Sequence, residues 1–149
     1  MNKLTRKLTE INQIRSQRGQ SMVELALSFT MLMFMLSATV DIGRAFYAYI
    51  AIRDAAQEGA AYGSLNPTDV AGIAEHVRTS STDPFDLTDV SSVNISVSWP
   101  DGFACAGNGL KVVVTYDLIF FMPLITTLVP SGRVLLTATM IDTIIAPPC

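Results

Sequence analysis

A long apolar run near the N-terminus limits what this chain can fold into. From Met22 to Val40 the sequence has 19 residues and a single charged side chain, Glu24. A helix rises 1.5 Å per residue, so this run spans most of the roughly 30 Å hydrocarbon layer of a bilayer. The run therefore predicts a transmembrane helix that anchors the rest of the chain.

The charged residues are divided unevenly by this run. Residues 1–19 carry five basic residues and one acidic residue, whereas residues 20–149 carry five basic and twelve acidic residues. A short basic arm beside an apolar helix stays in the cytoplasm, which sends the C-terminal part outside. The apolar residues of the arm have the spacing of a weak interfacial helix. The acidic bulk argues against a nucleic-acid partner, because phosphate binding needs clustered Lys and Arg.

A cleaved secretory signal peptide is the alternative interpretation of the run. Such a peptide has an apolar region of roughly 7–15 residues, followed by a small-residue cleavage site. The run here is longer, and the nearest small-residue stretch, residues 36–43, contains Asp41 and precedes Arg44. We therefore expect the run to stay in the membrane.

The helix is expected to continue beyond the membrane. Residues 41–63 contain no Pro and are rich in Ala, and Gly63 marks their end. A helix over residues 20–63 is about 65 Å long, twice the membrane thickness, so its outer half must pack on something outside. Aromatic residues directly follow the run, as at a membrane–water boundary. The apolar residues of this outer half form one broad band: Ile42, Phe46, Tyr49, Ile50, Ile52, Ala56 and Ala60.

Residues 64–149 predict a small exported domain that mixes a helix and strands. Asn66 as a cap, followed by Pro67, predicts a short helix that runs to about Thr79. Three strands follow from apolar alternation and β-branched residues, at residues 93–99, 110–116 and 133–145. Residues 100–102 predict a turn, and residues 117–130, which Pro123 and Pro130 interrupt, predict a loop or helical turn against the core or the membrane.

The expected fold class is α+β. In it, the long N-terminal helix packs on a small antiparallel sheet, because neither layer can close a core alone. The chain is thereby divided into a basic cytoplasmic leader (1–19), the long helix with the membrane anchor in its first half (20–63), and the exported domain (64–149).

The spacing from Gly19 to Glu24 is the most informative local pattern. A basic arm is followed by Gly, four residues, Glu and the apolar run. An unpaired acidic charge in the bilayer costs about 2.5–3.5 kcal/mol, so Glu24 is better placed beside a cation. The plainer interpretation is an acid near a helix N-terminus, which is favoured by about 0.3–1 kcal/mol.

Together these features resemble the leader of type IV pilins and pseudopilins, in which a membrane-embedded aspartic peptidase cuts after the Gly. Over residues 18–63, with GQSMVELAL and DIGRAFYAYIAIRDAAQEGAAYG, the chain more closely resembles the TadE-like family of tight-adherence pilus systems. These are single-span pseudopilins or minor pilins that a dedicated prepilin peptidase processes. The resemblance is weaker over residues 111–124 and 134–140.

The resemblance implies roles for individual residues. The cut would fall between Gly19 and Gln20, where Gly offers the peptidase an extended backbone without a clashing side chain. Glu24 would then pair with the new α-ammonium on Gln20 of a neighbouring subunit. The implied partners are membrane lipid, the prepilin peptidase, other pilin or pseudopilin subunits and inner-membrane assembly proteins.

The resemblance also implies a function and a location. The protein would be a pseudopilin or minor pilin, single-pass in the bacterial inner membrane, that is cut after Gly19 and incorporated into a tight-adherence pilus or primes it. The alternative is an uncleaved single-span scaffold of a pilus assembly or secretion platform.

The two cysteines, Cys105 and Cys149, lie on the expected exported side. An internal bridge would close a loop of about 45 residues and stabilise the domain by about 4 kcal/mol in the chain-entropy model. Two free thiols, or pairing between subunits, are the alternatives.

No enzyme, cofactor or metal site is expected. His76 is the only His and is expected to be solvated, and no Cys/His cluster has metal-ligand spacing. A Ser or Cys nucleophile lacks a base other than this His. No phosphate-binding loop and no small-molecule site is indicated. The acidic loop residues lack the spacing of a calcium loop: Asp83, Asp86, Asp89 and Asp101.

Overall fold

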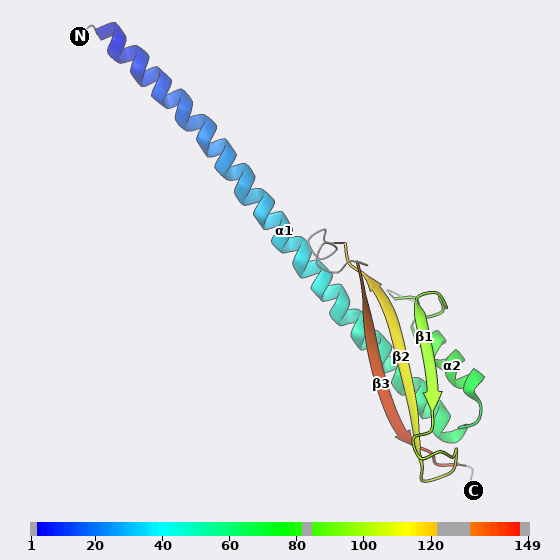
Figure 1. Cartoon of the computed structure of the whole chain (residues 1–149). Helices are drawn as coiled ribbons and strands as arrows, with labels where there is room; N and C mark the ends of the chain where they lie inside the picture. The colour runs from blue at the N-terminus through cyan, green and yellow to red at the C-terminus, as the bar shows by residue number, and fades with distance from the viewer. Residues whose placement is uncertain (1–2, 82–84, 122–131, 147–149) are drawn as a thin grey trace. The chain divides into compact units, whose positions relative to one another are not determined.

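The structure is a computed structural model, which describes residues 3–81, 85–121 and 132–146, with only the backbone given for residues 3–18. Its elements are α1 (Lys3–Leu65), α2 (Val70–Thr79), β1 (Val93–Ser98), β2 (Gly109–Ile119) and β3 (Arg133–Thr143) (Figure 1). The predicted α+β class is confirmed, with a long N-terminal helix packed on a three-stranded antiparallel sheet.

The chain divides into two compact units, Met1–Val40 and Asp41–Cys149. The first unit is a helix alone, and the second holds the rest of α1, α2 and the sheet. The boundary falls within α1, directly after the apolar run. The division predicted from the sequence (1–19, 20–63 and 64–149) is based on the expected cut and on the membrane crossing. The structure tests neither, so that division stays a prediction.

Helix α1 is 63 residues long and contains no Pro. It begins at Lys3 and is continuous through Gly19. The basic arm is therefore the first part of α1, whereas the sequence predicts a short interfacial helix of its own. Gly19 is helical in this structure, because the flanking sequence has good helix formers and nothing that stops a helix. The helix ends at Leu65, because Pro67 disfavours helical backbone in the residue before it.

One side of α1 in the second unit packs on the sheet. Its fully buried residues are small or β-branched: Ala48, Ile52, Ala55, Ala56 and Ala60. Most of them form one core cluster with residues of β2 and α2, including Val112, Val114 and Ile73. Helices α1 and α2 cover the same face of the sheet (Figure 1).

The broad apolar band predicted along residues 42–60 is only partly buried. The band divides into a buried row, with Ile52, Ala56 and Ala60, and an exposed row nearer the start of the unit. The exposed row consists of Ile42, Phe46, Tyr49 and Ile50. The physical reason is that the sheet covers only one side of the helix, and Ala side chains let it approach closely.

The sheet has the order β1-β2-β3, and both pairs are antiparallel. Its register places Val97 opposite Val112 and Val114 opposite Ala138. Alternate residues of the central strand β2 are buried, as the apolar alternation predicts.

The predicted strand positions are confirmed with shifted ends. Strand β2 continues to Ile119. Residues 117–119, which the sequence pattern assigns to a loop, therefore pair with residues 133–135 of β3. Strand β3 ends at Thr143, because Ile144 instead donates its N–H to Asn108. Of residues 117–130, those after Phe121, including both prolines, lie outside the described residues.

Helix α2 begins later than predicted. Its cap is Asp69, whose Oδ1 accepts the N–H of Gly72 at 2.9 Å. Asn66 instead extends the end of α1, because its N–H donates to the carbonyl of Tyr62. The predicted end at Thr79 is confirmed. The predicted turn at residues 100–102 is also confirmed, with the N–H of Gly102 bonded to the carbonyl of Trp99.

Candidate functional site

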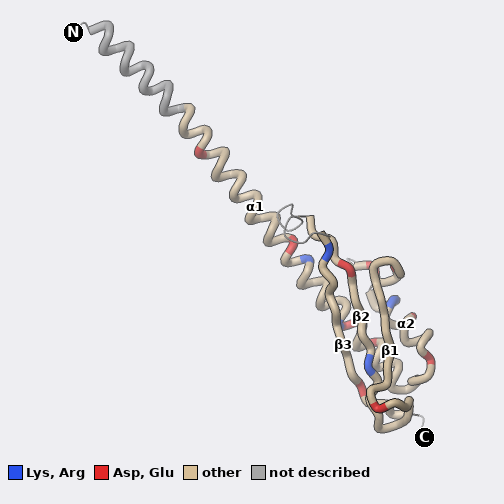
Figure 2. The backbone as a smooth tube through the Cα atoms, viewed as in Figure 1, with Lys and Arg blue, Asp and Glu red and all other residues tan. Residues whose placement is uncertain are grey.

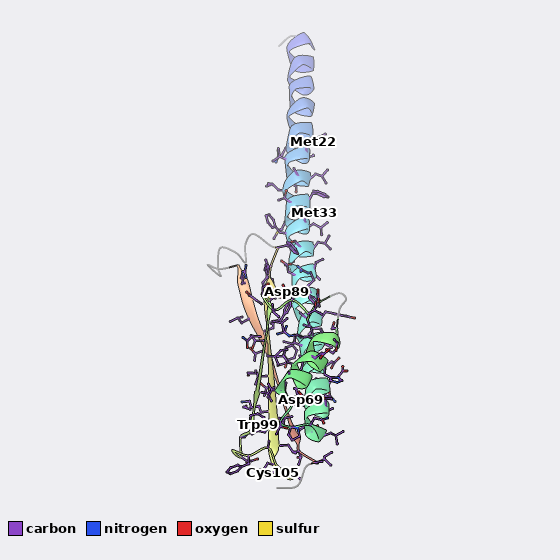
Figure 3. The ribbon with its side chains drawn as sticks, turned by 90° about the vertical axis from the view of Figure 1, so that its right-hand side faces the viewer. Met22, Met33, Asp69, Asp89, Trp99 and Cys105 are labelled. Carbon is purple, nitrogen blue, oxygen red and sulfur yellow. The ribbon has the colours of Figure 1, made fainter. Side chains whose placement is uncertain are left out.

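The first unit exposes nearly all of its apolar run. The large side chains from Met22 to Val40 project from α1 without neighbours, as Met22 and Met33 show in Figure 3. Charged residues are sparse along this part of the helix (Figure 2). Among the described residues, the segment Gly19–Leu65 is long and apolar enough to cross a membrane. A continuous apolar surface of this size requires an apolar environment, either lipid or other helices.

The predicted processing and assembly residues share one exposed helical segment. Gly19, Gln20 and Glu24 are all helical and exposed. A Cβ added at Gly19 would meet nothing within 4 Å, so the fold does not require Gly there. Gln20 and Glu24 are four residues apart and so lie on the same side of the helix. Glu24 makes no ion pair with the side chains that the structure describes. The cut and the charge pairing stay predictions.

The exposed row Ile42, Phe46, Tyr49 and Ile50 forms a second apolar surface, in the second unit. These residues recur at helical spacing along α1 and belong to neither of the core clusters that pack on the sheet. The sequence places them correctly on a helix, but it does not separate them from the buried Ala residues, which have the same period.

A buried acid lies where the second unit begins. Asp41 is only 2% exposed, and its Oδ1 accepts the N–H of Phe121 at 3.4 Å. Arg44 Nη1 lies 3.8 Å from the same oxygen, and the guanidinium lies 4.4 Å from the centre of the Phe121 ring. The acid three residues before Arg44 is visible in the sequence. Its partner 80 residues away is not.

A surface hollow lies at the turn between α1 and α2. Tyr62 donates its hydroxyl to Asp69 Oδ2 at 2.9 Å, and the His76 ring stacks on Tyr62 at 4.1 Å. The Gly72 N–H and then the Tyr62 hydroxyl lower the pKa of Asp69, and the bond to Asp69 raises the pKa of Tyr62. Ala71, Glu75 and Thr79 complete the lining.

These contacts fasten the two helices together. His76 stacks on Tyr62 and is half-buried, at the edge of the open hollow. The described residues include no group of three or more His, Cys, Asp and Glu that could hold a metal. At this hollow the Tyr62–Asp69 hydrogen bond and the stacked Tyr62 and His76 rings join α1 to α2.

Cys105 lies in the connection between β1 and β2 (Figure 3) and is not a free thiol. Cys149 lies outside the described residues. The bridge between them stays a prediction.

The comparison with protein families matches the segment that carries these exposed surfaces. The family model of TadE-like protein matches residues 19–61. This segment is TadE-like. The match begins at Gly19 and runs through Glu24, the apolar run and the exposed row. The resemblance predicted over residues 18–63 is thus confirmed over residues 19–61, and the weaker one over residues 111–124 and 134–140 stays a prediction. No curated protein and no solved structure matches the chain. The TadE-like segment and its exposed apolar helix together indicate a membrane-anchored, single-pass protein that takes part in a Tad pilus.

Proposed function

We propose that this protein is a pseudopilin or minor pilin of a tight-adherence pilus. It is inserted in the bacterial inner membrane through α1, cut after Gly19 by a prepilin peptidase, and then incorporated into the filament or used to prime it. The observation that carries this proposal is the uncovered apolar surface of the TadE-like segment, which extends from Met22 past the predicted membrane crossing.

The exposed row supports assembly with other subunits. Its residues, Ile42, Phe46, Tyr49 and Ile50, follow the apolar run, so lipid covers at most their first turn once the run fills the bilayer. Packing against a neighbouring helix removes these side chains from water. This burial stabilises the assembly by roughly 25 cal/mol per Å² of apolar area. The sheet does not cover these four residues, which stay exposed, so the row is available.

Glu24 gives the assembly a register. Left charged and unpaired in lipid, its carboxylate costs about 2.5–3.5 kcal/mol. Cleavage creates an α-ammonium on Gln20, and that cation on a neighbouring subunit compensates the charge. The bond between the two groups favours transfer from the membrane into a filament.

The exported domain has a supporting role. A Cys105–Cys149 bridge would fasten the C-terminus to the connection between β1 and β2. The partners of the protein are lipid, the peptidase, other pilin or pseudopilin subunits and inner-membrane assembly proteins. The protein would act by binding and not as an enzyme.

The uncleaved scaffold is the second candidate, and one observation favours it. The Gly19–Gln20 bond lies inside a continuous helix, whereas a peptidase needs unwound backbone at the bond it cuts. In this case the protein remains in the membrane and binds platform components through its exported domain.

The N-terminal sequence and the intact mass distinguish the two candidates. The protein is produced with and without the prepilin peptidase of its own system. We expect a chain that starts at Gln20 only when the peptidase is present. A chain that starts at Met1 in both cases would establish the scaffold instead.

A further inference from the structure

A groove in the second unit lies between α1 and the residues that follow α2. Its volume is about 250 Å³, and Ser80 and Ser81 line it where α2 ends. The side chains that α1 contributes are apolar, apart from two acids. They are Tyr47, Ile50, Ala51, Asp54 and Glu58. We call this the acidic groove. Its lining suits a side chain that has an apolar stem and a cationic head.

The two acids of the groove pair with no cation in the described part of the chain. Asp54 and Glu58 are exposed, and neither makes an ion pair there. They are four residues apart on α1, a spacing at which like charges repel each other. The hydroxyls of Ser80 and Ser81 do not relieve this repulsion, because they donate to backbone carbonyl groups. A cation from outside the subunit would compensate both acids.

Arg53 is a cation that this chain offers. It is exposed, and it forms no ion pair with the described residues, whereas Arg44 is engaged with Asp41. Arg53 directly precedes Asp54, and neighbours in sequence do not face each other on a helix. Glu58 is five residues further on, about 140° round the helix axis. Arg53 can therefore meet these two acids only on another copy of the chain.

Arg53 also ends an exposed apolar row on α1. We call this row with its terminal charge the basic stripe: Ile42, Phe46, Tyr49 and Arg53. Its members are four, three and four residues apart, which is the spacing of side chains that face one partner helix. Ile42 and Phe46 are each 66% exposed, so no described element covers them. The groove has the same spacing along α1, in Tyr47, Ala51, Asp54 and Glu58.

We propose that the basic stripe of one copy packs along the acidic groove of a second copy. Arg53 then lies between Asp54 and Glu58 of its neighbour, and the apolar part of the stripe lies on Tyr47 and Ala51. A second copy is the occupant that the groove fits, because the chain carries both surfaces, with matching spacing and opposite charge. This inference rests on the filament assembly of the proposed function and names the residues that join two subunits.

The positions of the two surfaces define how the copies are arranged. Stripe and groove occupy nearly the same length of α1, so the two helices run parallel, with a stagger of at most about 8 Å. Stripe and groove are different surfaces of one copy, so the contact is head-to-tail and leaves one of each free. Such a contact can repeat from copy to copy, as a filament requires.

Disulfide cross-linking tests the proposal on the full chain, in cells that assemble the pilus. Chains with Phe46→Cys or Tyr49→Cys are produced together with chains that carry Ala51→Cys, and copper phenanthroline oxidises thiols in contact. The two stripe positions allow for the stagger, since a disulfide needs Cα atoms within about 7 Å. We expect one of these mixtures to form about fivefold more dimer than either variant alone. The unsubstituted protein gives the background of the native cysteines.

Glu75→Cys is the matched control for the groove position, since Glu75 is exposed on α2 and lies outside the acidic groove. As much dimer with Glu75→Cys as with Ala51→Cys would overturn the pairing of stripe and groove. As much dimer from one variant alone as from its mixture would show a symmetric contact and overturn it too.

The filaments themselves separate this inference from the proposed function. If the variants reach sheared filaments but neither mixture forms dimers, the contact is overturned and the proposed function is left intact. If the unsubstituted protein is absent from sheared filaments, the proposed assembly fails, and the contact fails with it.

Charge exchange tests the role of Arg53. Arg53→Glu should lower the amount of protein in sheared filaments, relative to the membrane fraction, about fivefold, because like charges then face each other. Adding Asp54→Lys and Glu58→Lys to this variant restores opposite charges and should return the amount to within about twofold of the unchanged protein. Adding Glu75→Lys instead should not. Circular dichroism controls for folding. Equal amounts with and without the two groove substitutions would show that Arg53 does not meet these acids.

Discussion

Gly63 of α1 packs directly against Leu110 of β2, with no room for a side chain between them. A Cβ at Gly63 would overlap the Leu110 side chain and press on that of Ile73. All three residues are buried, so α1, α2 and the sheet meet at this point.

Gly63→Ala should destabilise the exported domain by about 1–3 kcal/mol, because one methyl group overpacks this contact. Gly43→Ala is the matched control on the same helix, since a Cβ there meets nothing within 4 Å. Because Ala has a higher helix propensity than Gly, Gly43→Ala should leave the free energy of unfolding unchanged or raise it by up to about 1 kcal/mol. Chemical unfolding in detergent, followed by circular dichroism, measures both. Equal stability of the two variants would show that the contact at Gly63 can relax.

Gly19→Leu should block processing, because the added side chain enters the peptidase cleft at the cut. The substitution should not affect the fold, since Gly19 has no neighbour within 4 Å. The measurement is the ratio of uncut to cut chain by intact mass when the peptidase is present, and we expect at least a tenfold rise. An uncut fraction no larger than that of the unchanged protein would contradict the assignment of the cut.

Glu24→Leu should leave cleavage intact and reduce incorporation into filaments, because the partner of the Gln20 ammonium is lost. Glu75→Leu, at an exposed acid on α2, is the control and should incorporate normally. The amount of each variant in sheared filaments, relative to the membrane fraction, gives the result. If filaments contain Glu24→Leu and Glu75→Leu in equal amounts, the pairing of Glu24 with the Gln20 ammonium is not needed for assembly.

The Asp69 cap should make the stability of the exported domain depend on pH at the acidic end. Its pKa is lowered by the Gly72 N–H and then by the Tyr62 hydroxyl, so its contribution is present above the ordinary Asp pKa of about 3.9. The contribution is lost as pH falls through the lowered value. Asp69→Ala should therefore lower Tm at pH 7, and the difference from the unchanged protein should shrink below about pH 4.

Asp69→Asn is the control for this effect. It keeps a capping oxygen without the titrating charge, so its Tm should lie between the other two at pH 7. A Tm difference for Asp69→Ala that stays constant from pH 7 to about pH 2 would show that ionisation of Asp69 is irrelevant.

Cys149→Ser should destabilise the exported domain by up to about 4 kcal/mol under oxidising conditions, if Cys149 closes a loop with Cys105. Under reducing conditions the variant and the unchanged protein should unfold alike. Chemical unfolding with and without dithiothreitol measures this, and non-reducing mass analysis checks for dimers. An equal loss in both conditions would exclude the internal bridge.

Much of the fold follows from local patterns. The apolar run, the absence of Pro over 63 residues and the alternation at β1 and β2 each depend on neighbours within a few positions. The TadE-like segment also lies in one continuous stretch, which is why it is visible without a structure.

Where local patterns allow two answers, the prediction is wrong. Asn66 and Asp69 are both good helix caps, and packing chose Asp69, because the end of α1 takes Asn66 and Tyr62 binds the Asp69 carboxylate. Residues 117–119 have the local sequence of a proline-broken loop, and only pairing with β3 makes them strand.

The sequence by itself determined that α1 is long, that it contains an apolar run from Met22 to Val40, and that Glu24 follows Gly19 at a fixed spacing. Only the tertiary structure decided which side of its second half is buried. Ile50 and Ile52 are equally apolar, yet one is exposed and the other is fully buried, because the sheet covers a single side of α1. It also decided that Asp41 meets Phe121, since a contact across 80 residues depends on where two separate elements pack and leaves no periodic trace in either.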